Sequence, residues 1–152
     1  MTWWDAGPTG MRLAILGFAL TFALHFAWEM LQAPVFMDFA ETLWAGTVRC
    51  FVAALGDVLI AIGAYVVAAL GFRRAAWPIQ DGWRAPAATW IVAGMLATIV
   101  FERWALARGR WVYGPEMPLV GGVGLLPLLQ WLVVPVLTLM AVRWFAPRTY
   151  VS

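Results

Sequence analysis

The chain has 152 residues, of which 64% are hydrophobic and only 12% are charged. A soluble domain typically has roughly 45–50% apolar and about 25% charged residues, so this composition excludes a soluble globular protein and requires lipid as solvent. The formal net charge of +2 is too small for a nucleic-acid footprint, and no nucleic-acid partner is expected. Every basic residue is an arginine, which excludes lysine-imine chemistry, and the single cysteine excludes an intrachain disulfide.

Four apolar runs reach the ~20 residues that a helix needs to cross a bilayer core. They cover about 12–33, 50–71, 87–107 and 118–141. These runs predict a single transmembrane domain, an all-α polytopic bundle of four transmembrane helices. The segment 34–49 is amphipathic and too short to cross, so we expect it to lie in the interface as a short helix near 36–46, or to re-enter. The arginine- and proline-containing segment 73–86 and the segment 107–118 are predicted as loops.

An even number of spans places both termini on the same side of the membrane. That side would carry six arginines against four on the other, which predicts a multi-pass protein of the cell (inner) membrane with cytoplasmic termini. Several tryptophans fall where spans should meet the headgroups, which is typical of interfacial anchoring. They are Trp3, Trp4, Trp44, Trp77, Trp83, Trp111 and Trp144.

Four ionisable side chains interrupt the apolar runs: His25 and Glu29 in the first, Asp57 in the second and Glu102 in the third. A charge near the bilayer centre costs at least ~2.5–3.5 kcal/mol on insertion scales, so such groups usually face the bundle interior and mark a site. Counted at ~1.5 Å per residue, all four fall in the non-cytoplasmic leaflet, and Gln130 falls near the midpoint of the fourth run. The four helices are therefore expected to contribute polar groups to one layer.

Three interpretations of this layer stay open. In the first it is structural: His25 pairs with Glu29, and Arg103 pairs with Asp57 or Glu29, so that the helices are tied together. In the second, His25 and the acids hold zinc, iron or manganese, although one histidine with scattered acids is a sparse ligand set and no metal-binding residue is assigned. In the third, carboxyl groups in a low-dielectric pocket keep a proton and donate it to a lipid-soluble substrate, with the imidazole as a relay.

The stretch ERWALARGRWVYGPEMPLVGGVGLLPLLQWLVVPVL (102–137) resembles the lycopene cyclase domain of carotenoid biosynthesis. Its acid corresponds to Glu102, its Gly-x-Trp-x-aromatic loop to residues 109–113 with Trp111 and Tyr113, and its Pro-Leu-x-x-Trp motif to residues 127–131. The paired glutamates of that family fall on Leu129 and Gln130, and a glutamine cannot donate a carboxylic proton. The resemblance therefore implies the wider group of membrane carotenoid proteins, hydratases included, rather than cyclisation by the family's usual residues. His25 with Glu29 is also similar to the His-x-x-x-Glu of four-helix sterol isomerases.

Together, the layer and the resemblance predict an enzyme that isomerises, cyclises or hydrates an isoprenoid or carotenoid-like lipid without a cofactor. Glu102 and Glu29 would exchange protons, His25 would relay them, and Asp57 would orient a neighbour or pair with Arg103. The pocket would be lined by Trp28, Arg103, Trp111, Tyr113, Gln130 and Trp131, whose tryptophan faces can stabilise a carbocation. Two alternatives stay open: a non-catalytic membrane subunit that binds a pigment, quinone or lipid, alone, as a homo-oligomer or in a larger complex, and a small proton or ion carrier.

Overall fold

The computed structural model describes residues 2–36 and 42–147. Within these ranges, four helices are long and apolar enough to cross a membrane. They are α1 (Gly7–Gln32), α2 (Leu43–Phe72), α3 (Arg84–Ala107) and α4 (Leu125–Phe145). The predicted all-α bundle of four transmembrane helices is therefore confirmed, and the chain is a multi-pass membrane protein.

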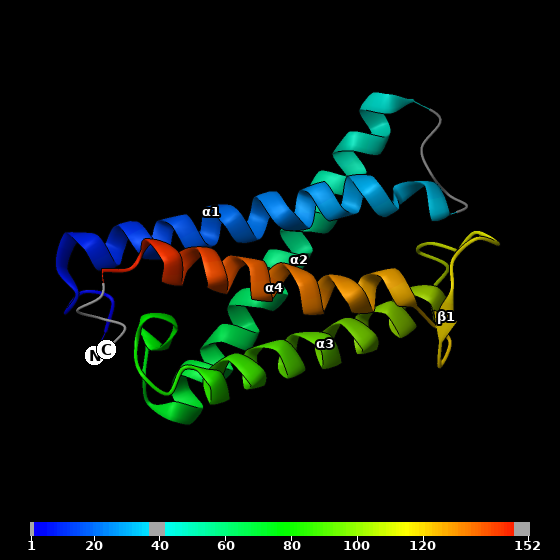
Figure 1. The fold of residues 1–152 in the computed structure, drawn as a ribbon. Helices are drawn as coiled ribbons and strands as arrows, with labels where there is room; N and C mark the ends of the chain where they lie inside the picture. The colour runs from blue at the N-terminus through cyan, green and yellow to red at the C-terminus, as the bar shows by residue number, and fades with distance from the viewer. Residues whose placement is uncertain (1, 37–41, 148–152) are drawn as a thin grey trace.

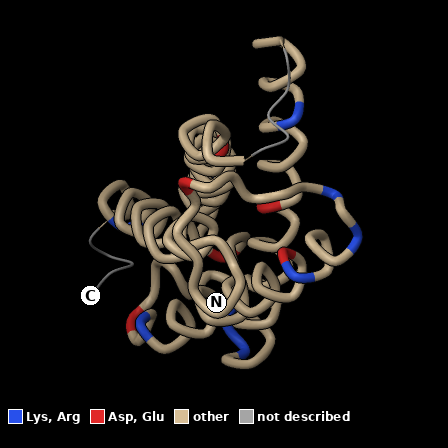
Figure 2. Tube along the Cα trace, turned by 90° about the vertical axis from the view of Figure 1, so that its right-hand side faces the viewer, with Lys and Arg blue, Asp and Glu red and all other residues tan. Residues whose placement is uncertain are grey.

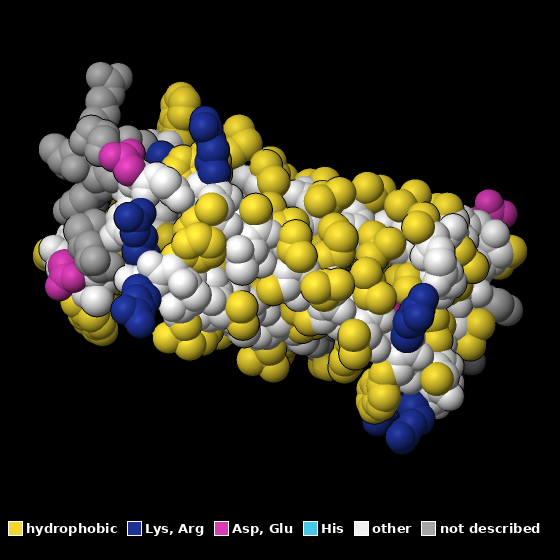
Figure 3. Space-filling model, turned by 90° about the horizontal axis from the view of Figure 1, so that it is seen from below, with side chains coloured by type: hydrophobic (Ala, Val, Ile, Leu, Met, Phe, Trp, Pro, Cys, Tyr) yellow, Lys and Arg dark blue, Asp and Glu magenta, His cyan; other side chains and the backbone are white. Residues whose placement is uncertain are grey.

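The helices form a closed ring of contacts, in which α1 and α3 each pack against both α2 and α4. Helices α1, α4 and α3 lie side by side, and α2 crosses them at a steep angle (Figure 1). The start of α1 and the end of α4 lie at one end of the bundle, which we call the terminal end. The face in Figure 3 is apolar through its middle and carries arginines towards both ends, as expected of a surface solvated by lipid tails between two layers of headgroups.

The second span begins earlier than the sequence predicts. Thr42 caps the N-terminus of α2, because its hydroxyl accepts a hydrogen bond from the Ala45 amide at 3.2 Å. Residues 43–46 are thus the first turn of α2, and α1 is followed by the 3-10 turn η1 (Ala33–Val35). The separate interfacial helix expected near 36–46 is wrong for the residues described there, while residues 37–41 lie outside the described part of the chain.

The fourth span begins later than predicted, at residue 125 instead of 118. Residues 118–124 form a hairpin of β1 (Leu119–Val120) and β2 (Val123–Gly124), which pair antiparallel. Gly121 and Gly122 make its two-residue turn with φ of +59° and +78°, the left-handed conformation that such turns require and that glycine adopts without strain. This correction places Gln130 near the start of α4, at the hairpin end of the bundle, and not at the middle of a span.

Small residues on the inner face of α2 allow its neighbours to approach closely. Ala54, Ala61 and Ala68 recur at heptad spacing and are buried, and the indole of Trp90 in α3 donates to the carbonyl oxygen of Ala61 at 2.9 Å. Trp77, expected at the headgroups, lies in the 3-10 turn η2 (Trp77–Ile79), which folds back onto the bundle and buries the ring completely. Its ring packs against those of Tyr65 and Trp90.

Candidate functional site

Three helices meet at a hydrogen-bonded group formed by His25 of α1, Asp57 of α2 and Gln130 of α4. The Gln130 amide donates to Asp57 Oδ2 at 2.9 Å, and its Nε2 lies 2.7 Å from His25 Nδ1. His25 Nδ1 is also 3.4 Å from Asp57 Oδ2. Because the amide nitrogen only donates, Nδ1 accepts from it, and a neutral His25 carries its proton on Nε2. The side chains of His25 and Gln130 are almost fully buried, so this group joins α1, α2 and α4 inside the bundle.

The last turns of α1 extend the polar layer. The Gln32 amide donates to Glu29 Oε1 at 2.7 Å, and Gln32 Oε1 accepts from the Trp28 indole at 3.2 Å. The expected pairing of His25 with Glu29 is therefore replaced, because His25 Nδ1 faces Gln130 and Asp57 while Gln32 binds Glu29. Glu29 remains close enough to Asp57 and Gln130 to interact with both.

A second group is built around Glu102, which is buried on the inner face of α3. The Tyr113 hydroxyl and the Trp111 indole both donate to Glu102 Oε2, the indole at 3.3 Å. Burial raises the pKa of the Tyr113 phenol, and the neighbouring Glu102 carboxylate raises it further, so the phenol keeps the proton with which it donates. These three residues, which the resemblance places in one stretch of the chain, are thus in direct contact.

The loop that carries Trp111 and Tyr113 is held against the end of α1. The Gly114 amide donates to the Val35 carbonyl oxygen at 2.8 Å, and Phe36 and Tyr113 form an isolated antiparallel bridge. Their rings also lie 5.5 Å apart. The position of the donors on Glu102 therefore depends on the contact between this loop and the chain that follows α1.

Arg103 does not take part in the layer. Successive residues in a helix point about 100° apart, so a buried Glu102 places Arg103 outward, and the side chain is exposed. Its guanidinium donates to the Gly121 carbonyl oxygen at 3.0 Å, at the hairpin turn. The expected pairing of Arg103 with Asp57 or Glu29, and its place in the pocket lining, are wrong.

Trp131 packs beside the polar layer, between His25 of α1 and Gly94 of α3. Its ring is fully buried, lies 5.5 Å from the His25 ring, and packs directly on Gly94 of α3. Within the described residues, its Nε1 and His25 Nε2 are buried without a hydrogen-bond partner, and so is Thr98 Oγ1. Buried donors without partners are costly and uncommon, so the layer has spare hydrogen-bonding capacity towards a bound polar group.

The two groups belong to one electrostatic unit, because Asp57 lies within interacting distance of both Glu29 and Glu102. Viewed along the bundle, arginines lie mostly at the periphery while several acids lie nearer the middle (Figure 2). In residues 2–36 and 42–147, no three His, Cys, Asp or Glu side chains are placed to hold a metal ion. The polar side chains of the layer are hydrogen-bonded to one another instead, across α1, α2 and α4 and between α3 and the loop that follows it.

Gln130 has a more central place in the layer than the sequence predicts. The sequence predicts a lining residue at mid-span, whereas Gln130 bridges His25 and Asp57. Gln130 is an isolated amide in an otherwise apolar run, and this was the one feature of the sequence that indicated an interior role. Its depth in the bundle depends on where α4 begins, which is at Leu125.

Comparison with models of known protein families, with curated proteins and with solved structures found no match to this chain. The resemblance of residues 102–137 to the lycopene cyclase domain therefore stays a prediction.

Proposed function

We propose that this protein is a membrane enzyme that performs acid–base chemistry on an isoprenoid or carotenoid-like lipid, by isomerisation, cyclisation or hydration. The observation that carries the proposal is the presence in one layer of two carboxyl groups from different helices, Glu29 of α1 and Glu102 of α3, each with its own hydrogen-bond donors. The proposal includes a place in the cell (inner) membrane with cytoplasmic termini, which the distribution of arginines favours.

In the first step Glu102 is the acid. Its proton adds to one carbon of a substrate double bond, so that a C–H bond forms from the π electron pair and the adjacent carbon becomes a cation. The carboxylate left on Glu102 accepts from the Tyr113 hydroxyl and the Trp111 indole on Oε2, and such charge-assisted bonds are about twice as strong as neutral ones. Aromatic faces such as those of Trp28 and Trp131 would stabilise the cation.

In the second step a base removes a proton from a neighbouring carbon, and the electron pair of that C–H bond forms the new double bond. Glu29 is the proposed base and takes up this proton. Glu29 then releases a proton and Glu102 regains one, with His25, held by Gln130 and Asp57, as the proposed relay, so both carboxyl groups return to their starting state. For cyclisation a second double bond of the substrate attacks the cation before the proton leaves. For hydration a water oxygen attacks and then loses a proton. None of these reactions changes the net oxidation level of the substrate, so the chemistry requires no redox cofactor.

Lipid conversion in cells tests the proposal. The chain is produced in a bacterium that makes isoprenoids and carotenoids, and extracted lipids are compared by mass spectrometry with those of cells carrying the empty vector. We expect a new or depleted isoprenoid species with the wild-type chain. Glu102→Gln should reduce that conversion by about 10²–10⁴-fold, the usual contribution of a general acid.

Glu116→Gln is the matched control, because it removes a carboxylate from the same loop region at an exposed position. It should leave the conversion unchanged. Full conversion by Glu102→Gln would contradict the proposal. A wild-type chain that changes no lipid, but carries a stoichiometric pigment or quinone through purification, would favour a binding subunit instead.

A further inference from the structure

An open hollow lies at the terminal end of the bundle, beside the last turn of α2. It has a volume of about 430 Å³ and is lined by Arg73, Arg74, Gln80 and Asp81. Sites for small molecules typically measure about 300–1,000 Å³, so the hollow has room for a lipid headgroup. None of its lining residues belongs to the polar layer.

The hollow lies at the level of the lipid headgroups. The membrane-spanning part of α2 ends at Phe72, and Arg73 and Arg74 follow directly. Leu70 and Phe72, just inside the membrane, are 73% and 40% exposed, so an apolar surface adjoins the two guanidinium groups. Figure 3 shows arginine side chains at this end of the molecule next to the apolar middle of the face. A molecule that contacts both surfaces carries an anionic group and a hydrocarbon chain.

The charge around the hollow is positive. Two arginines line it against one acid, Asp81, and two more arginines lie close by. These are Arg84 and Arg143, whose Cζ atoms lie 5.8 and 4.7 Å from the centre of the Trp83 ring. None of the four arginines forms an ion pair with a carboxylate of residues 2–36 or 42–147. Four cations around one acid attract an anion, and like charges held this close are stabilised by one.

Arg73 occupies a position in the backbone that normally takes another residue type. It ends α2 with φ of +54° and ψ of +37°, and among the described residues it is the only non-glycine residue with a positive φ. Glycine or asparagine is usual at such a helix end, because a Cβ atom is strained there. The neighbouring Arg74 is fixed by a hydrogen bond from Nη1 to the Asp81 carbonyl oxygen at 2.8 Å. Arg73 therefore contributes its guanidinium to the hollow at a cost in backbone conformation.

We propose that this hollow binds the phosphate of an anionic phospholipid, with an acyl chain along the exposed end of α2. Arg73 and Arg74 donate to the phosphate oxygens, which the planar guanidinium matches in geometry. The adjoining apolar surface selects a lipid over a free phosphate. The inference is independent of the acid–base function, because it uses no residue of the layer.

Binding of defined lipids to the full chain in a non-ionic detergent tests it. Native mass spectrometry counts bound lipids during titration with dioleoyl phosphatidylglycerol, or with dioleoyl phosphatidylcholine, which has the same chains and no net charge. We expect the anionic lipid to bind at least about fivefold more tightly, the effect of roughly one arginine at a membrane surface. Equal affinity for the two lipids would overturn the proposal. Displacement of the lipid by an equal concentration of glycerol 3-phosphate would contradict the part assigned to the acyl chain.

Variants locate the binding. Arg73→Asn removes the guanidinium and suits the left-handed backbone, and it should weaken binding of phosphatidylglycerol by about fivefold. Arg108→Asn is the matched control, because Arg108 is also exposed and directly follows a span, at the opposite end of the bundle. It should leave the affinity unchanged.

Asp81→Asn provides a test that a folding defect cannot imitate. It removes the one negative charge that lines the hollow and keeps the backbone oxygen that binds Arg74. Because that charge repels a phosphate, the variant should bind phosphatidylglycerol about two- to fivefold more tightly. The proposal is wrong if neither Arg73→Asn nor Asp81→Asn changes the affinity, or if Arg108→Asn weakens binding as much as Arg73→Asn.

Discussion

Replacing Gly94 by alanine should break the contact between α3 and α4 that supports the polar layer. A Cβ atom at this position would lie 2.7 Å from Cη2 of Trp131 and closer still to Cε3 and Cζ3. Ordinary carbon contacts are about 3.5–4.0 Å, so the ring must move by more than 1 Å, roughly the difference between these distances. Trp131 is fully buried, so that movement has to separate the helices.

The size of the effect follows from two opposing contributions. Overpacking a well-packed core costs typically about 1–3 kcal/mol, while alanine in place of a helical glycine contributes about 1 kcal/mol of stability. Because the overlap is with a rigid ring, we place the cost at the upper end of that range. The net loss in the free energy of unfolding should be about 2 kcal/mol.

The assay is reversible unfolding in mixed micelles, followed by tryptophan fluorescence. Gly63→Ala is the matched control, since a Cβ at Gly63 of α2 has no other atom within 4 Å. It should raise the free energy of unfolding by about 0.5–1 kcal/mol. The packing argument is refuted if Gly94→Ala proves as stable as Gly63→Ala.

Three further predictions concern the layer and the residues next to it. A double-mutant cycle of Gln130→Leu and Asp57→Ala should give a coupling energy of about 0.6–1.7 kcal/mol in micelles, the range of interhelical hydrogen bonds in membranes; a value near zero would mean that the bond at 2.9 Å does not join α2 to α4. Arg103→Gln should change the free energy of unfolding by less than about 0.5 kcal/mol, as for other exposed positions. A much larger loss of stability would show that Arg103 forms a buried ion pair after all. Spectrophotometric titration of wild type minus Tyr113→Phe should place Tyr113 ionisation above the ordinary value of 10.0. Because the folded phenol ionises at higher pH than the unfolded one, its stabilising contribution is complete below pH 10 and is lost as the pH rises through the folded pKa. Ionisation of Tyr113 at or below pH 10 would contradict its burial against Glu102.

Much of the bundle follows from the hydropathy of the chain, because a helix of the right length is the only way for an isolated apolar run to satisfy its backbone in lipid. The boundaries depend on local chemistry that hydropathy does not register. Thr42 starts α2 within a segment that looks interfacial, and the Gly121–Gly122 turn removes residues 118–124 from the fourth span.

The candidate site was predictable in its depth and less so in its contacts. Helical spacing places His25, Glu29, Asp57 and Glu102 in one layer, but it cannot say which side chains touch across helices. The change in the start of α4 brought Gln130 to His25 and Asp57. Arg103 could have been assigned outward from the same periodicity that buries Glu102.

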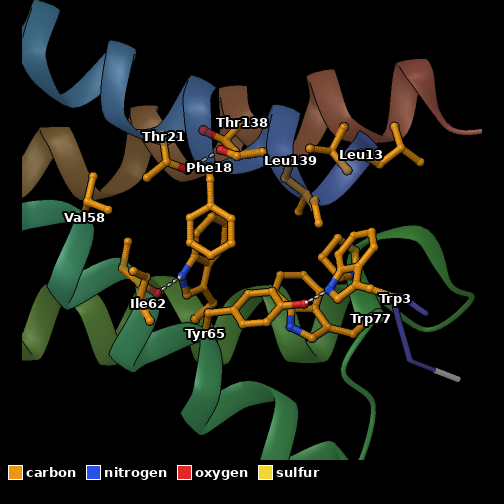
Figure 4. A pocket seen from close by; sticks show the side chains of 16 residues that line it. Trp3, Leu13, Phe18, Thr21, Val58, Ile62, Tyr65, Trp77, Thr138 and Leu139 are labelled. Atoms are coloured by element: carbon orange, nitrogen blue, oxygen red, sulfur yellow. Dashed lines mark hydrogen bonds between the residues drawn. The ribbon is translucent and has the colours of Figure 1, made fainter. Parts of the chain in front are cut away.

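The sequence does not predict the apolar pocket between α1, α2 and α4 on the terminal side of the layer (Figure 4). It is formed by Trp77 folding back from a loop, Trp3 from the N-terminal segment and Thr138 of α4, residues that tertiary structure alone brings together. Trp3 and Trp77 lie at positions in the sequence that are typical of interfacial anchors. The loop after α2 folds back onto the bundle, and this fold buries the Trp77 side chain in the core.

The central claim is that the layer transfers protons to and from carbon atoms of a lipid. Membranes containing the chain can be incubated in deuterated water, and their isoprenoid lipids analysed by mass spectrometry for deuterium in carbon-bound positions. The account predicts enzyme-dependent incorporation with the wild type and with Glu116→Gln, and loss of that incorporation with Glu102→Gln. If the lipids gain no deuterium above membranes without the chain, or if Glu102→Gln incorporates it as fast as the wild type, the layer does not perform this chemistry.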